Sequence, residues 1–166
     1  MTRRILYSLL SFCAVFLANS QNYNMTNGQT IYTCEGTFYD SGGPNANYGN
    51  TQTMTYTICP PANSDSSIMM TFTQFELENN ADYLYVYDGP DITAPLIATF
   101  TGTEVPLAFQ ATGDNESGCL TFRFVSDTYN NFAGWAATIS CQQECQTISA
   151  QLANSIPTAN QNIIRT

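Results

Sequence analysis

Short apolar runs separated by turn residues are the feature of this sequence that most limits its possible folds. Runs rich in Val, Ile, Tyr, Phe and Thr alternate with clusters such as "DSGGPNANYGN", "PPANSDS", "DGPD" and "GDNESG", and no helical period intervenes. The predicted strands are 30–39, 53–59, 68–77, 83–88, 95–100, 106–110, 119–126 and 133–140. Strands this short and evenly spaced predict an all-β domain, a two-sheet antiparallel β-sandwich or jelly roll.

The N-terminus is predicted to lie outside that domain. Arg3 and Arg4 precede an apolar run over 5–17, and the small residues of 18–20 favour cleavage before Gln21. The run is shorter than the roughly 20 apolar residues of a membrane-spanning helix. Residues 1–20 therefore read as a signal peptide, and the protein is predicted to be secreted, with no membrane insertion after cleavage.

The rest of the chain divides by composition. Residues 21–30 form a lead-in, 31–141 the folded domain, and 142–166 a polar tail or linker rich in Gln and Asn. That tail has too few large apolar side chains to build a core of its own. With Cys145 left unpaired, it suggests a domain that precedes another part of a longer chain.

Negative charge limits the possible partners. Cleavage removes two of the four arginines, so thirteen acidic residues face Arg123 and Arg165, a net charge of −11. Nucleic acid is excluded, because binding to it depends on cations that neutralise phosphates. An anionic membrane surface is disfavoured for the same reason. A bound cation, a basic partner surface or solubility alone remain compatible with this charge.

Five of the six cysteines follow the signal segment, where an oxidising compartment favours disulfides over metal binding. Cys119 and Cys141 flank two predicted strands and the loop between them, so hairpin geometry predicts that they pair. Cys34 and Cys59 then pair by elimination. In that hairpin Val125 lies beside Trp135, but both strand faces carry apolar residues, which leaves the core face undecided.

The sequence gives little support for an enzymatic function. The sequence has no histidine, no G-x-S-x-G elbow and no Gly-rich phosphate loop after a strand. A pair of carboxylates acting on a glycoside is the one remaining chemistry. Such pairs lie in clefts of larger scaffolds, so the chain is interpreted as non-catalytic.

Two motifs resemble the CUB domain, a jelly-roll β-sandwich of secreted proteins. "DYLYVYDG" at 82–89 and "LTFRFVSDTYNNFAGWAATI" at 120–139 follow its pattern, and "NYGNTQTMTYTI" before them resembles its first strands. The match covers about 31–141 and departs from the family pattern at Met54, where a cysteine is usual. The "DSGG" and "TICP" stretches resemble CUB-like domains of bacterial secreted proteins.

This resemblance implies a calcium site. In many CUB domains the ion lies at one end of the sandwich, held by a Glu before the first motif, the Asp of D-Y and the Asp of S-D. These positions are Glu78, Asp82 and Asp127 here. Carboxylates from separate loops, with carbonyls and waters, suit calcium. The segment between Glu78 and Asp82 is shorter than usual, which leaves Glu76 as a substitute ligand.

Other conspicuous side chains receive simpler interpretations. Asp88 is predicted to accept N–H bonds within its own turn, and Asp91 to be solvated. The tyrosines at 83, 85 and 87 share one strand face, as packing in a half-buried sheet favours. Tyr48, in a loop rich in Gly and Asn, is predicted to contact a partner.

The sequence as a whole predicts a secreted binding or adhesion module, calcium-dependent, that contacts an extracellular protein or a surface glycan through loops at the calcium end. Two alternatives remain open. One is a structural spacer in a larger surface protein, and the other is an accessory domain of a secreted protease.

Overall fold

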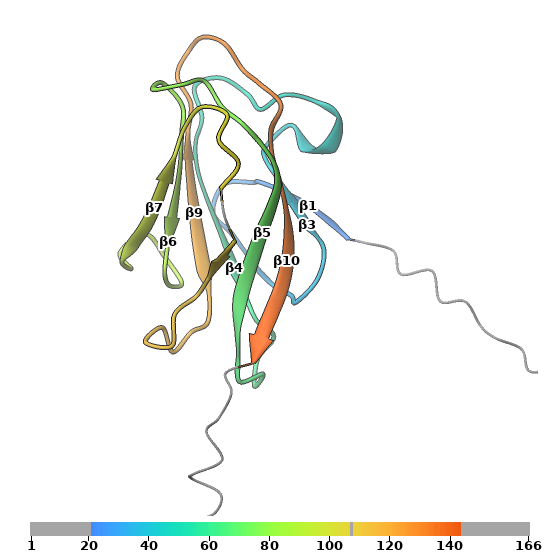
Figure 1. The fold of residues 1–166 in the computed structure, drawn as a ribbon, viewed down its shortest axis with the longest axis vertical. Helices are drawn as coiled ribbons and strands as arrows, with labels where there is room; N and C mark the ends of the chain where they lie inside the picture. The colour runs from blue at the N-terminus through green and yellow to red at the C-terminus, as the bar shows by residue number, and fades with distance from the viewer. Residues whose placement is uncertain (1–20, 107, 144–166) are drawn as a thin grey trace, which may run out of the picture.

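Two five-stranded sheets pack face to face in the computed structural model, which describes residues 21–106 and 108–143 (Figure 1). One sheet has the strand order β1-β3-β10-β5-β8 and the other β2-β4-β9-β6-β7. The strands are β1 (Asn22–Asn24), β2 (Gln29–Tyr32), β3 (Thr37–Tyr39), β4 (Thr53–Cys59), β5 (Ser66–Glu76), β6 (Tyr83–Tyr87), β7 (Leu96–Phe100), β8 (Phe109–Gln110), β9 (Leu120–Val125) and β10 (Gly134–Gln143). The predicted β-sandwich is confirmed. None of the described helices is long and apolar enough to span a bilayer.

The sheets are mixed rather than purely antiparallel, which corrects one part of the prediction. β1 runs parallel to β3, and β2 runs parallel to β4. The predicted strand 30–39 is in fact two strands, β2 and β3, which belong to different sheets. Gly36, with φ of +115°, lies in the turn between them, a conformation that favours glycine.

Large aromatic side chains fill the space between the sheets. Phe38 packs against Tyr56, Phe122 and Trp135 with ring centroids 5.0, 5.2 and 5.8 Å apart. Leu120, Phe122 and Phe124 of β9 are completely buried, so that face of the strand is the core face. β6 alternates in the same way, with its leucine and valine inward and its three tyrosines half-buried on the outer face.

The predicted hairpin of the last two strands is wrong. β9 lies between β4 and β6 in one sheet, whereas β10 lies between β3 and β5 in the other. The loop that joins β9 to β10 therefore crosses from sheet to sheet and does not close a hairpin. Consequently Val125 pairs with Thr53 and Tyr83, and Trp135 pairs with Phe75.

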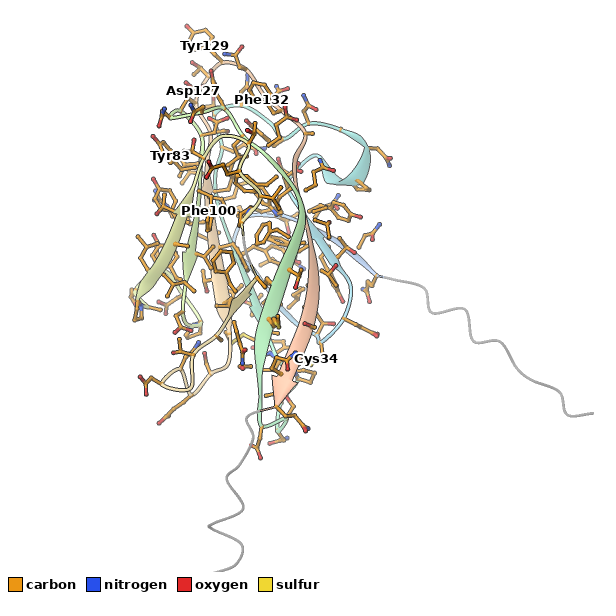
Figure 2. All side chains as sticks on the ribbon, in the orientation of Figure 1. Cys34, Tyr83, Phe100, Asp127, Tyr129 and Phe132 are labelled. Atoms are coloured by element: carbon orange, nitrogen blue, oxygen red, sulfur yellow. A yellow bond between two sulfur atoms is a disulfide. The ribbon has the colours of Figure 1, made fainter. Side chains whose placement is uncertain are left out.

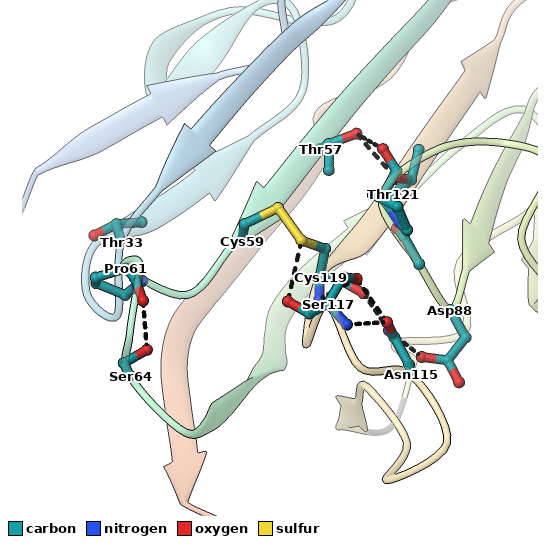
Figure 3. The surroundings of a disulfide bond; sticks show 12 residues. Thr33, Thr57, Cys59, Pro61, Ser64, Asp88, Asn115, Ser117, Cys119 and Thr121 are labelled. Atoms are coloured by element: carbon teal, nitrogen blue, oxygen red, sulfur yellow. Dashed lines mark hydrogen bonds between the residues drawn. A yellow bond between two sulfur atoms is a disulfide. The ribbon is translucent and has the colours of Figure 1, made fainter.

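The predicted disulfide pairing fails for the same reason. The four predicted cysteines do form two bonds, but these are Cys34–Cys141 and Cys59–Cys119. Cys59 ends β4 directly beyond the Ile58–Leu120 pair of the β4–β9 ladder, which places it opposite Cys119 (Figure 3). Each bond closes a long stretch of chain, and such bonds stabilise a domain by a few kcal/mol.

Candidate metal centre

Three carboxylates meet at one end of the sandwich. Glu78 follows β5, Asp82 directly precedes β6, and Asp127 lies two residues beyond β9. β6 and β9 are antiparallel neighbours whose Tyr83–Val125 pair lies at this end, so the residues just outside the pair converge. One carboxylate oxygen of each residue lies within 4.8 Å of the other two. Figure 2 shows Asp127 and Tyr129 at this end and Cys34 at the other.

A tight turn brings Glu78 to the cluster despite the short loop. The N–H groups of Ala81 and Asp82 both donate to the carbonyl oxygen of Glu78, at 3.4 and 3.1 Å. Asn80 within the turn has a φ of +58°, which asparagine tolerates better than most residues. Glu76, the predicted substitute, ends β5 opposite Gly134 and does not belong to the cluster.

Tyr48 supports the cluster from inside the protein, which corrects its prediction as a partner contact. Its side chain is 1 % exposed and packs edge-on against Phe124 at 5.0 Å. The hydroxyl donates to Asp82 Oδ2 at 2.6 Å and accepts from the N–H of Glu78 at 3.0 Å. Burial, followed by the hydrogen bond to Asp82, raises the pKa of Tyr48 well above its ordinary value, so the phenol stays protonated.

The remaining hydrogen bonds orient the three carboxylates. Asp82 is fully buried, and its Oδ1 accepts from the N–H of Asp127 at 2.8 Å. Asp127 Oδ1 in turn accepts from the N–H of Tyr129 at 2.8 Å. Asn130, which the sequence did not single out, donates its amide to Glu78 Oε1 at 2.7 Å. These bonds connect the loops that follow β5 and β9.

One atom of the cluster lacks a hydrogen-bond partner. Glu78 Oε2 is buried and accepts no hydrogen bond from any described residue. Arg123 is the sole cationic residue in the described part of the chain, and its guanidinium lies over the ring of Tyr85, 5.4 Å from the centroid. An unpaired buried carboxylate oxygen is costly unless an ion or a donor completes its coordination.

This donor set fits a hard cation. Calcium takes six to eight oxygen ligands at about 2.3–2.6 Å, so oxygens on opposite sides of the ion are roughly 5 Å apart. The three carboxylate oxygens lie within 4.8 Å of one another, so all three can belong to the coordination sphere of one calcium ion. Glu78, Asp82 and Asp127 are the residues that would hold such an ion.

Asp88 has a role that the sequence analysis missed. Its carboxylate accepts hydrogen bonds from the N–H and hydroxyl of Thr112 and from the side-chain amide of Asn115 (Figure 3). Asp88 therefore stabilises the loop between β8 and β9 rather than its own turn. The prediction that Asp88 bonds within its own turn is therefore wrong, and such turn bonds are made instead by Asp91, which was predicted only to be solvated. Asp91 is exposed, and its carboxylate accepts from both the hydroxyl and the N–H of Thr93, which lowers its pKa.

Known proteins resemble this chain in sequence and in fold. A family model described as "CUB domain" matches residues 27–139. Human cubilin is 35% identical over 101 residues, which is 57% of this chain and 3% of cubilin. Mouse tolloid-like protein 2 is 31% identical over 116 residues, 68% of this chain and 11% of that protein. The chain thus spans a small fraction of the length of these relatives.

Among solved structures, the CUB2 domain of MASP-1 bound to Ca²⁺ superposes with a TM-score of 0.55 at 20% sequence identity. The alignment covers 69% of this chain and 99% of that domain. At this level of identity the likeness establishes a common fold.

Proposed function

The chain belongs to the CUB domain family, and on that basis we propose that it is a secreted, non-catalytic binding module whose ligand surface depends on calcium. One observation carries the calcium part of the proposal. Three carboxylates converge at the end of the sandwich, and among the described residues neither a hydrogen-bond donor to the buried Oε2 of Glu78 nor a cationic side chain accompanies them. A divalent cation relieves both their repulsion and the unpaired oxygen.

Calcium would order the loops at this end. Glu78 and Asp82 bracket the turn between β5 and β6, and Asp127 begins the crossing between the sheets. An ion held by all three fixes two separate loops relative to each other. Asp82 is oriented for this by the hydroxyl of Tyr48, and Glu78 by the amide of Asn130. A rigid loop surface binds a partner at lower entropic cost than a mobile one.

The partner would be an extracellular protein or a surface glycan that contacts the rim of this end. Tyr129 is 72% exposed there, two residues after Asp127, and takes the contact role that the sequence analysis gave to Tyr48. Exposed tyrosine is favoured in binding surfaces because it offers a large area with few rotatable bonds. The net charge of −11 on the mature chain favours a partner with a basic surface.

The structural-spacer alternative rests on the length of the relatives, since the chain matches only 3% of cubilin and 11% of tolloid-like protein 2. The same fact suits an accessory domain of a secreted protease. Convergence of the carboxylates beside an exposed tyrosine favours the binding role, because a spacer has no need of an exposed aromatic residue at an ion site.

Affinity capture tests the proposal. The mature protein is immobilised and incubated with proteins and glycans from the native surface fraction, in calcium and then in chelator. A partner retained in calcium and released by chelator is expected, and Asp127→Asn should fail to retain it while Asp91→Asn retains it. Capture that is indifferent to chelator and to Asp127→Asn would contradict the proposal and favour a calcium-independent domain.

A further inference from the structure

Within residues 21–106 and 108–143, the two sheets have four edge strands with no neighbour on the outer side, and one of these edges differs from the other three. β1 and β8 end one sheet and have three and two residues, while β2 ends the other sheet with four. Short edge strands offer few free N–H and C=O groups, which is one way that proteins prevent unwanted strand pairing. The fourth edge, β7, has five residues, and β6 is the one described strand that pairs with it.

The β7 edge also lacks charged side chains. Its sequence is "LIATF", and no charged residue lies between Asp91 and Glu104, although the mature chain is strongly acidic. Edge strands are commonly protected by Lys or by Pro within the strand, and β7 has neither. It has one protective irregularity, a bulge at Ile97, beyond which Ala98, Thr99 and Phe100 keep regular register with β6.

Apolar side chains are exposed along this edge. Six large apolar residues are exposed in the described chain, and three of them lie in β7 or the turn before it: Ile92 at 47%, Leu96 at 52% and Ile97 at 39%. Leu96 pairs with Tyr87 and so lies on the outer face, next to the row of half-buried tyrosines. The inner face of the same strand presents Ala98 and Phe100, both half-buried against the core. The edge therefore carries apolar side chains on both faces, together with the exposed hydroxyl of Thr99 on the outer one.

We propose that β7 is a docking edge for an extended segment of another protein, which adds a sixth strand to the sheet β2-β4-β9-β6-β7. Main-chain hydrogen bonds to the free side of β7 would provide affinity, and side chains above and below would provide specificity. None of the three carboxylates lies on this edge, although Thr101, directly after β7, donates its hydroxyl to the carbonyl oxygen of Glu78 at 2.9 Å. The proposal is independent of the proposed calcium-dependent function.

Charge and polarity indicate the chemistry of the segment. Its centre must be apolar or β-branched on both faces, to cover Leu96 outside and Ala98 and Phe100 inside. Asp91 and Glu104 are exposed and flank the strand in sequence, so Lys or Arg at the ends of the segment would complement them. A second copy of this chain fits poorly, because it repeats the same acidic flanks and carries the same net negative charge.

Direct binding of a synthetic strand tests this proposal. The probe is the labelled peptide acetyl-KKTVTVTKK-amide, titrated with the mature protein by fluorescence anisotropy in calcium and in chelator. Saturable binding with a Kd below about 1 mM is expected, equal in both conditions. Hydrogen exchange should show slower exchange of the β7 amides in the complex.

Matched variants and peptides separate strand addition from simple adhesion. Leu96→Lys and Thr99→Lys place a cation on the outer face of β7. Each should raise the Kd of the peptide at least about tenfold, which corresponds to a loss of about 1.4 kcal/mol of binding free energy. Tyr32→Lys, at the opposite edge of the same sheet, should not. A peptide N-methylated at alternate residues should not bind, because its N–H groups are blocked, and a Glu-flanked peptide should bind more weakly.

Three results would overturn the proposal. One is the absence of binding at millimolar protein. Another is binding that survives both N-methylation and Leu96→Lys. The third is self-association of the wild type in sedimentation equilibrium that Leu96→Lys abolishes, which would assign the edge to a second copy.

Discussion

Asp127→Asn is the most direct test of the carboxylate cluster, because it removes a charge and little else. Asp127 is exposed, and the hydrogen bond that its Oδ1 accepts from the N–H of Tyr129 can be kept by the amide oxygen of asparagine. The variant should lose calcium-dependent stabilisation. Without calcium it should melt slightly above the wild type, since it relieves repulsion.

The magnitudes follow from the geometry. At 4.8 Å two unit charges in water repel by about 1 kcal/mol, and salt reduces this further. Relief of the repulsion between Asp127 and its two neighbours is thus worth about 1 kcal/mol. A calcium concentration a hundredfold above Kd stabilises the wild type by about 2.7 kcal/mol. For a domain of this size that corresponds to a rise in Tm of about 10 °C.

Thermal unfolding followed by circular dichroism, with calcium and with chelator, provides the measurement. Asp91→Asn is the matched control, since it removes an exposed carboxylate outside the cluster and should keep the full calcium response. An unchanged wild-type melting curve after chelation would refute the calcium site. So would a loss of the response in Asp91→Asn equal to that in Asp127→Asn.

Three further predictions concern the hydroxyl of Tyr48, the glycine at 134 and the buried carboxyl of Asp40. Tyr48→Phe leaves a carboxylate oxygen of Asp82 without its hydrogen-bond donor. The free energy of unfolding in chelator, measured with urea, should fall by about 1–3 kcal/mol, and the affinity for calcium should weaken. Unchanged values of both would contradict the role of the hydroxyl. Gly134→Ala should lower the free energy of unfolding by at least about 2 kcal/mol, because φ is +67° and the new Cβ would lie 2.1 Å from Asp40 Oδ2. An unchanged free energy of unfolding would contradict this steric argument and show that the loop adapts. Burial raises the pKa of Asp40 to about 6. The stabilisation linked to protonation of this carboxyl is therefore present below pH 4 and is lost as the pH rises through 6, by about 3 kcal/mol. The free energy of unfolding measured with urea should fall across this pH range in the wild type, and this fall should be absent in Asp40→Asn.

Local sequence patterns were sufficient for the class of fold, and the resemblance to a family supplied the members of the cluster. Strand alternation and turn residues predicted a sandwich, because side chains on half-buried strands repeat every two residues. Asp82 and Asp127 were predictable at strand ends because the D-Y and S-D motifs adjoin apolar runs. The set of three ligands, with Glu78 as the third, came from the family resemblance. Its approach to Asp82 depends on a turn that the sequence suggested only by its asparagines.

The tertiary structure alone decided which strands are neighbours, and the disulfide pairing follows from that order. Cys119 and Cys141 flank consecutive strands, yet β9 and β10 belong to different sheets, so each cysteine pairs elsewhere. A local pattern specifies that a strand forms and which residues share a face, whereas its partner depends on the packing of the whole chain.

The burial of Tyr48 has the same origin. Its Gly and Asn neighbours indicate a loop, but a loop can carry one large side chain inward when the core has room for its ring and a partner for its hydroxyl. Phe124 supplies the first and Asp82 the second, and both lie far from Tyr48 in sequence. The sequence by itself therefore determined the fold class and the charges of the site. The three-dimensional packing decided which of those groups meet, because contacts between distant residues exist only once the sheets have assembled.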